Sequence, residues 1–221
     1  MKLTIAHLYP DSMSLYGEYA NIAVLRRHLE AMGVEAAVRN FTCEDPPDFS
    51  DADFIYMGAG TERRQKSVLI AAPRCAPALK AAAENGAVIL FTGNAMETLG
   101  ASVTDAAGKV WPGYGLADFT TVETDQRTPG DVVASPVLWD APAVGFMNKC
   151  SVTHGIAAPL FHSLPLGFGN EAEHGAEGYV SGNVFATHLT GPALVKNPDF
   201  LDLVIRRLFA LKGWEVPERL P

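Results

Sequence analysis

The sequence predicts an α/β protein with a mainly parallel central sheet and a β-rich second half. In the first hundred residues, short apolar runs alternate with helical patterns, and the runs at 54–57 and 87–91 are continuously apolar. Continuous apolar strands separated by helices are typical of a parallel sheet that is covered on both faces. From Ser102 to about Thr190, glycine, proline and β-branched residues are frequent and helical patterns are few. This change in character indicates an antiparallel extension.

The chain opens with a strand, a helix and a second strand. Lys2–Leu8 is a short apolar run, and a turn-rich stretch separates it from a helical pattern over Glu18–Met32. The apolar residues of this pattern recur every three or four positions, as on one face of a helix; they are Ile22, Leu25, Leu29 and Met32. Gly33 occupies the place of a left-handed helix cap, and Val34–Phe41 reads as the second strand.

Two further strands and a helix complete the first half. Asp53–Met57 (DFIYM) predicts a third strand, which ends in the sequence Gly-Ala-Gly. A helix is expected from about Arg74 to Asn85, closed by Gly86. Ala87–Phe91 (AVILF) is apolar at every position, so it is expected to lie at the centre of the sheet.

The second half contains mostly strand patterns. Asp105–Gly108 is typical of a hairpin turn, and Phe119–Thr124, Val132–Leu138 and Val144–Met147 predict strands of the extension. An apolar stripe over Pro198–Leu211 predicts a closing helix.

Composition limits the classes of function. With 221 residues and no internal repeat or linker, we expect one domain spanning 1–221, since domains average about 150 residues. The 17 basic and 25 acidic residues give a net charge of −8, which argues against a nucleic-acid partner. No apolar stretch approaches the roughly 20 residues that a bilayer requires, and the first residues lack a signal-peptide pattern. We therefore expect a cytoplasmic protein without a membrane partner.

No cofactor or metal site is predicted. The three cysteines, Cys43, Cys75 and Cys150, lack the spacing of a disulfide framework or a zinc site. The six histidines are scattered, and no phosphate-binding loop motif is present. Among the histidines, His188 is of interest because a strand pattern runs into a turn there.

Two strand ends are candidate ligand sites, because ligands of open α/β sheets bind at the carboxyl ends of strands. Gly58-Ala59-Gly60 follows the third strand and offers exposed backbone N–H groups. Thr92-Gly93-Asn94 follows the fourth strand and precedes a helix near Ala95, which is the strand–turn–helix arrangement of a nucleophile elbow. Glycine-containing turns of this kind are also common without function, so each signal is weak by itself.

Four blocks in the same order resemble the GatD-type glutamine amidotransferases. Residues 8–21 (LYPDSMSLYGEYAN) resemble their opening, and 58–65 (GAGTERRQ) resembles their glycine-rich oxyanion loop. Residues 167–178 (GFGNEAEHGAEG) and 191–198 (GPALVKNP) are similar to two later blocks. These proteins are glutaminase subunits of lipid II isoglutaminyl synthase and are related to the glutaminase domains of cobyric acid synthase.

The resemblance implies a flavodoxin-like, three-layer class I glutamine amidotransferase fold of the CobB/CobQ type. It also implies ligand contacts near the oxyanion loop, the elbow and the third block. The expected ligand-binding residues are Gly58, Gly60, Gln65, Gly93, Asn94 and Asn170.

The chain departs from the family pattern at both catalytic positions. The family's cysteine attacks the glutamine side-chain amide while a late histidine acts as its base. In the gap-free register Gly93 stands at the cysteine position, and a shift of one residue places Thr92 there. The histidine of the family's Leu-His-Gly-Pro is Thr190 here. Losing nucleophile and base together costs on the order of a millionfold in rate, so we expect a degenerate site with no confident catalytic residue.

Three hypotheses follow. The first is a degenerate subunit that still binds a Mur-ligase-like synthetase, in cell-wall metabolism or in cobalamin-type amidation. The second is a different hydrolase or transferase in the same cleft, in which Thr92, Glu97 and His188 converge with Thr190; the simpler alternative is that His188 is a hydrogen-bonded core residue. The third is a sensor of a glutamine-like small molecule, bound by backbone donors. Glu97 argues against an anionic ligand.

Overall fold

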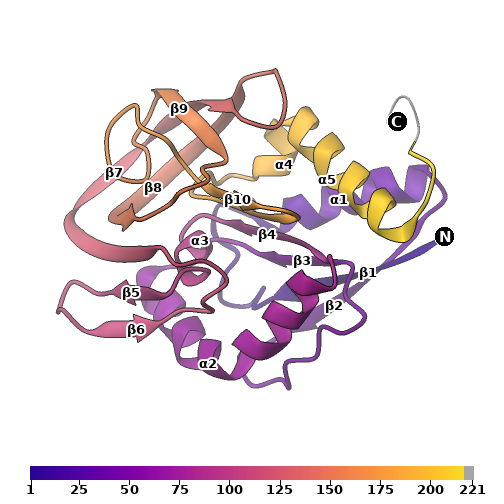
Figure 1. Ribbon diagram of the computed structural model, residues 1–221, viewed down its shortest axis with the longest axis horizontal. Helices are drawn as coiled ribbons and strands as arrows, with labels where there is room; N and C mark the ends of the chain where they lie inside the picture. Colours follow the sequence, from indigo (N-terminus) through magenta and orange to yellow (C-terminus); the bar gives the residue numbers. More distant parts are fainter. Residues whose placement is uncertain (217–221) are drawn as a thin grey trace.

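The computed structural model describes residues 1–216 and contains two sheets (Figure 1). The larger sheet has the strand order β10-β11-β4-β3-β1-β2 and is parallel except for β10. Its strands are β1 (Lys2–Leu8), β2 (Glu35–Phe41), β3 (Phe54–Met57), β4 (Val88–Thr92), β10 (Tyr179–Ser181) and β11 (Val184–Thr187). As the continuous apolar runs predict, β3 and β4 are buried at every position in the middle of this sheet.

Helices cover both faces of the larger sheet and form a three-layer arrangement of the flavodoxin-like type. The helices are α1 (Tyr19–Ala31), α2 (Glu62–Glu84), α3 (Ala95–Thr98), α4 (Ala193–Lys196) and α5 (Pro198–Lys212), with a 3-10 turn at Leu15–Gly17. Apolar residues of α1 and α5 pack into one core cluster, and those of α2 pack into a second cluster. No helix among the described residues is long and apolar enough to cross a bilayer.

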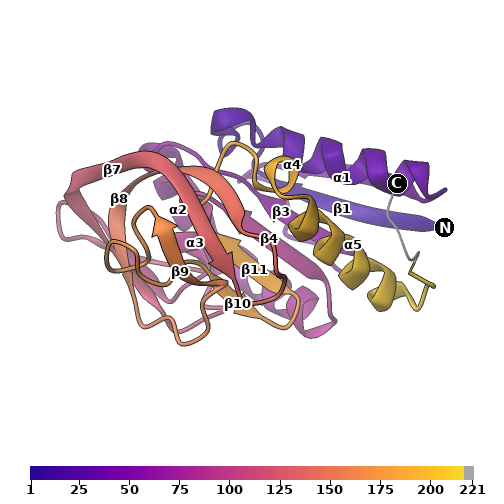
Figure 2. The same ribbon diagram turned by 90° about the horizontal axis from the view of Figure 1, so that it is seen from above.

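The second sheet accounts for the β-rich half of the sequence. It consists of β5 (Ser102–Thr104), β6 (Val110–Pro112), β7 (Thr120–Pro136), β8 (Ala143–His154) and β9 (Phe161–Leu166). The long strands β7 and β8 pair in antiparallel fashion, with a register shift between Glu123 and Thr128. Seen from above, β7 and β8 occupy one end of the molecule, and α1 and α5 extend toward the other (Figure 2).

Two predicted boundaries are wrong for identifiable reasons. The helix expected from Arg74 begins twelve residues earlier, where the Thr61 side chain caps α2 by accepting the Arg64 N–H; the prolines Pro73 and Pro77 lie within it. The strands predicted separately at 119–124 and 132–138 are the two ends of β7. Pairing with β8 carries this strand through the polar residues between them.

The buried side chain of Asn197 links β8 to the closing helices. Its Oδ1 accepts the Val144 N–H at 2.7 Å, and its Nδ2 donates to the carbonyls of Val144 and Ala193 at 2.9 and 2.8 Å. We expect Asn197→Ala to lower the free energy of unfolding by about 2 kcal/mol, because it leaves buried backbone groups unpaired. Urea unfolding measures the change. The exposed Asn40→Ala on β2 is the control, with an expected change within about 0.5 kcal/mol; equal losses in both variants would contradict this role.

Candidate functional site

A cavity of about 200 Å³ lies between the two sheets, at the carboxyl ends of the central strands. The loops after β3, β4 and β11 form one wall, β7 and β8 form the opposite wall, and Leu15 and Tyr16 lie at its margin. Carboxyl strand ends are where open α/β sheets hold their ligands. Of the predicted site residues, the cavity wall contains Gly60, Gly93, Asn94, Glu97, His188 and Thr190.

Gly93 has the backbone conformation of an elbow residue but no room for a side chain. Its φ is +61°, a left-handed conformation that side chains rarely adopt. A Cβ atom built on Gly93 would lie 2.5 Å from the Cβ of Ala59 and 2.9 Å from the Cγ2 of Thr190. The volume that a nucleophile's first carbon would need is therefore already occupied by two methyl groups.

The glycines of the loop after β3 have different environments. The Gly60 N–H donates to the Oδ1 of Asn94 at 2.9 Å, so this predicted ligand donor already has an internal acceptor. Gly58 is not part of the cavity wall. A Cβ at Gly58 would lie 2.7 Å from the Cβ of Glu18 and 2.9 Å from the Met13 carbonyl oxygen. Gly58 is thus required for close packing, and the expectation that it contacts a ligand does not fit this position.

Thr92 does not converge with Glu97 and His188. Its side chain is fully buried off the cavity wall. The Thr92 hydroxyl donates to the carboxyl group of Glu18 and lies 2.9 Å from the Tyr56 hydroxyl. Side chains of β4 alternate between the two faces of the sheet, and Thr92 lies on the face toward α1. The geometry therefore does not support the hypothesis that Thr92 is a nucleophile in this cavity.

Glu18 supports the loop that contains Thr190 from beneath. Its Oε1 accepts the Gly191 N–H at 2.9 Å, and its Oε2 lies 2.7 Å from the Tyr56 hydroxyl. The Glu18 side chain is fully buried. Burial raises the pKa of Glu18 above its usual value and outweighs the opposing hydrogen bonds from Thr92, Tyr56 and Gly191.

We expect the effect of Glu18→Gln on stability to depend on pH. With its raised pKa, Glu18 keeps its proton in the folded state at pH values where the unfolded chain has released it, so the contribution of Glu18 to stability falls as pH rises above about 4.5. The amide of the variant cannot ionise. The unfolding free energy of Glu18→Gln minus that of the wild type should therefore increase with pH, by at most about 1.4 kcal/mol per pH unit. Urea unfolding between pH 4 and 8 tests this. The exposed Glu44→Gln should follow the wild type, and parallel profiles for Glu18→Gln would contradict the prediction.

Glu97 is a buried carboxylate at the base of the cavity. Its Oε1 accepts from the Ser151 hydroxyl at 2.5 Å, and its Oε2 accepts from the Gln65 Nε2 at 2.6 Å. Burial by itself disfavours the charge, but His188 and these two donors outweigh burial and hold the pKa of Glu97 below its usual value. Gln65 also donates to the Asn94 carbonyl at 2.7 Å and lies behind the wall. Gln65 therefore positions Glu97 rather than a ligand.

His188 lies between two carboxylates. Its Nδ1 is 3.0 Å from Oε1 of Glu177, and its Nε2 is 3.4 Å from Oε1 of Glu97. The His188 side chain is 1% exposed, yet it forms part of the cavity wall. β11 ends at Thr187, so the alternation of a strand does not explain why His188 and Thr190 both reach the cavity. The turn after the strand brings them there.

Two functional candidates escaped the sequence analysis, Lys149 and Ser151. The strand prediction stopped at Met147, whereas β8 continues to His154 with every second residue buried. The signal was the alternation of polar residues in Lys-Cys-Ser-Val-Thr. The Lys149 Nζ donates to the Gly169 carbonyl at 2.6 Å. Burial lowers the pKa of Lys149, and the nearby Glu177 and Glu97 oppose that shift.

The charges at the cavity mouth are paired with one another. Arg127 donates to Oε1 of Glu62 at 2.5 Å, and Lys66 forms a short ion pair with Glu123. Tyr16 accepts a hydrogen bond from the Asn148 Nδ2 at 2.8 Å across the opening.

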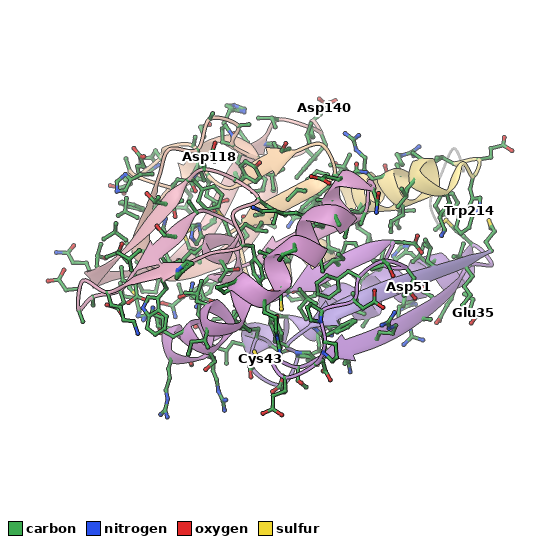
Figure 3. All side chains as sticks on the ribbon, turned by 60° about the horizontal axis from the view of Figure 1, so that its bottom comes forward. Glu35, Cys43, Asp51, Asp118, Asp140 and Trp214 are labelled. Carbon is green, nitrogen blue, oxygen red and sulfur yellow. The ribbon has the colours of Figure 1, made fainter. Side chains whose placement is uncertain are left out.

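None of the three cysteines lies at the elbow. Cys150 lines the cavity, but burial raises its pKa to about 11, and a thiol without thiolate character is a poor nucleophile. Cys75 is buried beside the Tyr9 hydroxyl, and Cys43 lies at the periphery of the molecule (Figure 3). Among residues 1–216, no group of three or more metal-ligating side chains could hold a metal ion.

Asn170 lies outside the cavity, contrary to expectation. Its side chain donates to the Gly178 carbonyl and accepts the Gly178 N–H, both at 3.1 Å. The resemblance placed Asn170 in a ligand-binding block, but both ends of its amide bond Gly178 and close the loop between β9 and β10. Its role in the structure is to fix that loop, which also carries Glu177.

Comparisons with known proteins agree with the geometry. The profile of the CobB/CobQ-like glutamine amidotransferase domain matches residues 4–198. The chain is 28% identical over 212 residues to subunit GatD of the glutamine-hydrolyzing lipid II isoglutaminyl synthase of Staphylococcus aureus (strain N315), covering 96% of this chain and 86% of that protein. It is 29% identical over 199 residues to the same subunit of Streptococcus pneumoniae (strain ATCC BAA-255 / R6), covering 89% and 76%.

Solved structures of glutamine amidotransferases share the fold. One superposes with a TM-score of 0.57 at 12% identity, covering 94% of this chain and 98% of the other. Another, from Thermotoga maritima, gives a TM-score of 0.55 at 9% identity and covers 96% and 94%. At these identities the similarity establishes the architecture, and the cavity described above has to be interpreted from its own residues.

Proposed function

Since the chain belongs to the CobB/CobQ-like glutamine amidotransferase family, we propose that it is a GatD-like subunit that has lost glutamine hydrolysis and acts through a partner. The observation that carries the loss is the filled elbow: the Cβ of a residue at position 93 would lie 2.5 Å from the Ala59 methyl carbon. Neither a thiol nor an imidazole stands at the family's positions, where Gly93 and Thr190 are found. The proposal treats 1–221 as one amidotransferase-like domain.

The proposed partner is a Mur-ligase-like synthetase. The two relatives are subunits of lipid II isoglutaminyl synthase, which favours cell-wall amidation over cobalamin-type amidation. The opening block is supported by tertiary contacts here, because Asn21 donates to the Tyr56 hydroxyl at 2.7 Å and accepts the Leu194 N–H at 2.8 Å. These contacts connect the opening block to the 191–198 block. We interpret the two connected blocks as a scaffold that is retained for binding the partner.

One experiment tests both parts of this proposal. The tagged protein is captured from its own cells under native conditions, and glutamate release from glutamine is measured for the isolated protein and for the captured complex. A ligase-like protein in the complex without glutamate release supports the proposal. Capture of no ligase-like protein contradicts the partner role, and glutamate release from the complex that is abolished by a substitution in this chain contradicts the loss of hydrolysis.

A second candidate function is an enzyme that uses Glu97 and His188 in the same cavity without Thr92. The observation that favours it is the contact of His188 with Glu97 on one side and Glu177 on the other. If captured material turns over an amide substrate, His188→Ala should abolish the turnover. Thr92→Ala should preserve it, because Thr92 lies off the cavity wall. A sensor of a glutamine-like molecule predicts a thermal shift with millimolar glutamine or glutamate, and an unchanged melting temperature would count against that third candidate.

A further inference from the structure

β2 is an open edge of the larger sheet. It stands last in the strand order and, among residues 1–216, pairs only with β1, without a register shift. Proteins usually protect a sheet edge with a short strand, a proline, a lysine or a bulge, because unpaired backbone groups there can pair with another chain. The opposite edge is protected in this way, since β10 has three residues. β2 (EAAVRNF) has seven residues and contains neither proline nor lysine, so its edge is available for pairing.

Every second residue of β2 directs its backbone groups away from β1. The Glu35 N–H donates to the Met1 carbonyl at 2.9 Å, and the Phe41 carbonyl accepts the Tyr9 N–H at 2.7 Å. Because backbone direction alternates along a strand, the odd-numbered residues of β2 bond β1 and the even-numbered residues face the open edge. The residues that face the open edge are Ala36, Val38 and Asn40. Their N–H and C=O groups have no backbone partner within the described part of the chain, so β2 offers a regular row of donors and acceptors to a further strand.

Two charges on β2 select how a second copy fits this edge. Glu35 and Arg39 lie on the same face of the strand, because side chains two positions apart share a face. Antiparallel pairing about a two-fold axis at Ala37 places Glu35 of each copy opposite Arg39 of the other. In the same register Ala36 lies opposite Val38, and each such pair exchanges two backbone hydrogen bonds. An axis at Val38 would also match the backbone groups, but it brings no opposite charges together.

The charges of this edge form an alternating row when two copies pair. Within one copy, Nζ of Lys2 lies 3.4 Å from Oε1 of Glu35, and Arg39 donates to Oδ1 of Asp51 at 2.5 Å. These side chains are between 42% and 70% exposed. The axis at Ala37 joins the two pairs across the junction, so that basic and acidic side chains alternate. A network of exposed charges is stabilising where a single exposed pair contributes little, so a second copy complements this edge better than an uncharged strand does.

We propose that β2 pairs in antiparallel fashion with β2 of a second copy of this chain, with Ala37 at the two-fold axis, so that the two larger sheets join into one. No residue of β2 belongs to the wall of the cavity, so the junction lies outside the candidate site. The dimer therefore depends neither on the loss of glutamine hydrolysis nor on a synthetase partner. Partner capture and glutamate release are measured separately, so either proposal can fail alone.

Sedimentation velocity over a range of concentrations tests the dimer in the intact protein. We expect a monomer–dimer equilibrium for the wild type. Arg39→Glu and Glu35→Arg each place like charges opposite one another at both symmetric contacts, so each should raise the dimer dissociation constant about tenfold or more. An equimolar mixture of the two variants should recover the dimer, because every contact then joins opposite charges. The contacts to Lys2 and Asp51 within each copy are the same in the mixture as in the separate variants, so recovery can come only from contacts between copies.

The outcomes that would overturn the proposal are specific. A wild type that stays monomeric up to about 1 mM excludes the dimer and leaves a strand of another protein as the occupant. A mixture that is no more dimeric than its two components excludes the register centred on Ala37.

Two further variants separate strand pairing from net charge. Arg26→Glu reverses one charge of the exposed Arg26–Glu30 pair on α1 and should leave the dissociation constant unchanged; an effect equal to that of Arg39→Glu would contradict the junction at β2. Val38→Pro removes an outward N–H without removing a bond to β1, so it should abolish the dimer while circular dichroism shows a folded chain. A fully dimeric, folded Val38→Pro would also contradict the proposal. If this variant unfolds, the mixing experiment still decides.

Discussion

Gly93→Cys alone is expected to destabilise the protein by about 2–4 kcal/mol and to release no glutamate from glutamine. The substitution places a side chain on a residue with a φ of +61°, and its Cβ would collide with methyl groups of Ala59 and Thr190. Left-handed backbone and overpacking each cost on the order of 1–3 kcal/mol. Urea unfolding gives the loss of stability, and an assay of glutamate release gives the activity.

The combined variant should behave differently. Ala59→Gly and Thr190→His remove both methyl groups, and Thr190→His also adds the family's late histidine. Asn94→Gly removes the acceptor of the Gly60 N–H, which now donates to Asn94 at 2.9 Å. With Gly93→Cys, these changes bring a thiol, an imidazole and a free oxyanion donor together. We expect this variant to be more stable than Gly93→Cys alone and to release glutamate. The steric argument fails if the single substitution folds with wild-type stability.

Lys149→Met is expected to lower the free energy of unfolding by about 3–5 kcal/mol. Lys149 is 3% exposed and is the buried cation near the carboxylates of Glu97 and Glu177. Methionine has a similar volume, so packing is kept while the charge is lost and the carboxylates remain. Removing one partner of a buried ionic network costs about this much because it leaves an uncompensated charge. Chemical denaturation at neutral pH measures the change.

Two variants distinguish loss of charge from loss of packing in this experiment. Lys2→Met changes a surface lysine whose side chain is 64% exposed, and should shift stability by no more than about 0.5 kcal/mol. Adding Glu97→Gln to Lys149→Met removes one of the unpaired charges and should recover part of the loss. If the double variant is no more stable than Lys149→Met, the effect belongs to packing and the charge-network account is wrong.

Local sequence patterns predicted much of the fold. The apolar runs at 54–57 and 87–91 predicted the central strands, because a strand buried on both faces must be apolar throughout. The periodic residues of α1 and α5 gave their buried faces, since helix periodicity is a local property of the chain. The four family-like blocks then indicated a CobB/CobQ-like amidotransferase, and the profile matching residues 4–198 confirms that family.

The boundaries that failed depend on partners distant in the chain. β7 pairs with β8 on both sides of a register shift between Glu123 and Thr128, and no window of sequence around residue 125 contains that information. For the same reason, Lys149 and Ser151 were missed: they face inward only because β8 packs with its buried side toward Glu97 and His188.

The sequence by itself therefore determined the family and the α/β architecture, since these are properties of residue identity and short-range order. Only the tertiary structure decided which side chains share the cavity. It separated Thr92 and Asn170 from the wall, because both are held by internal hydrogen bonds. It joined Glu97, His188 and Lys149, which come from three separate segments. Burial and charge pairing between such segments depend on the packing of two sheets, which no single stretch of the chain encodes.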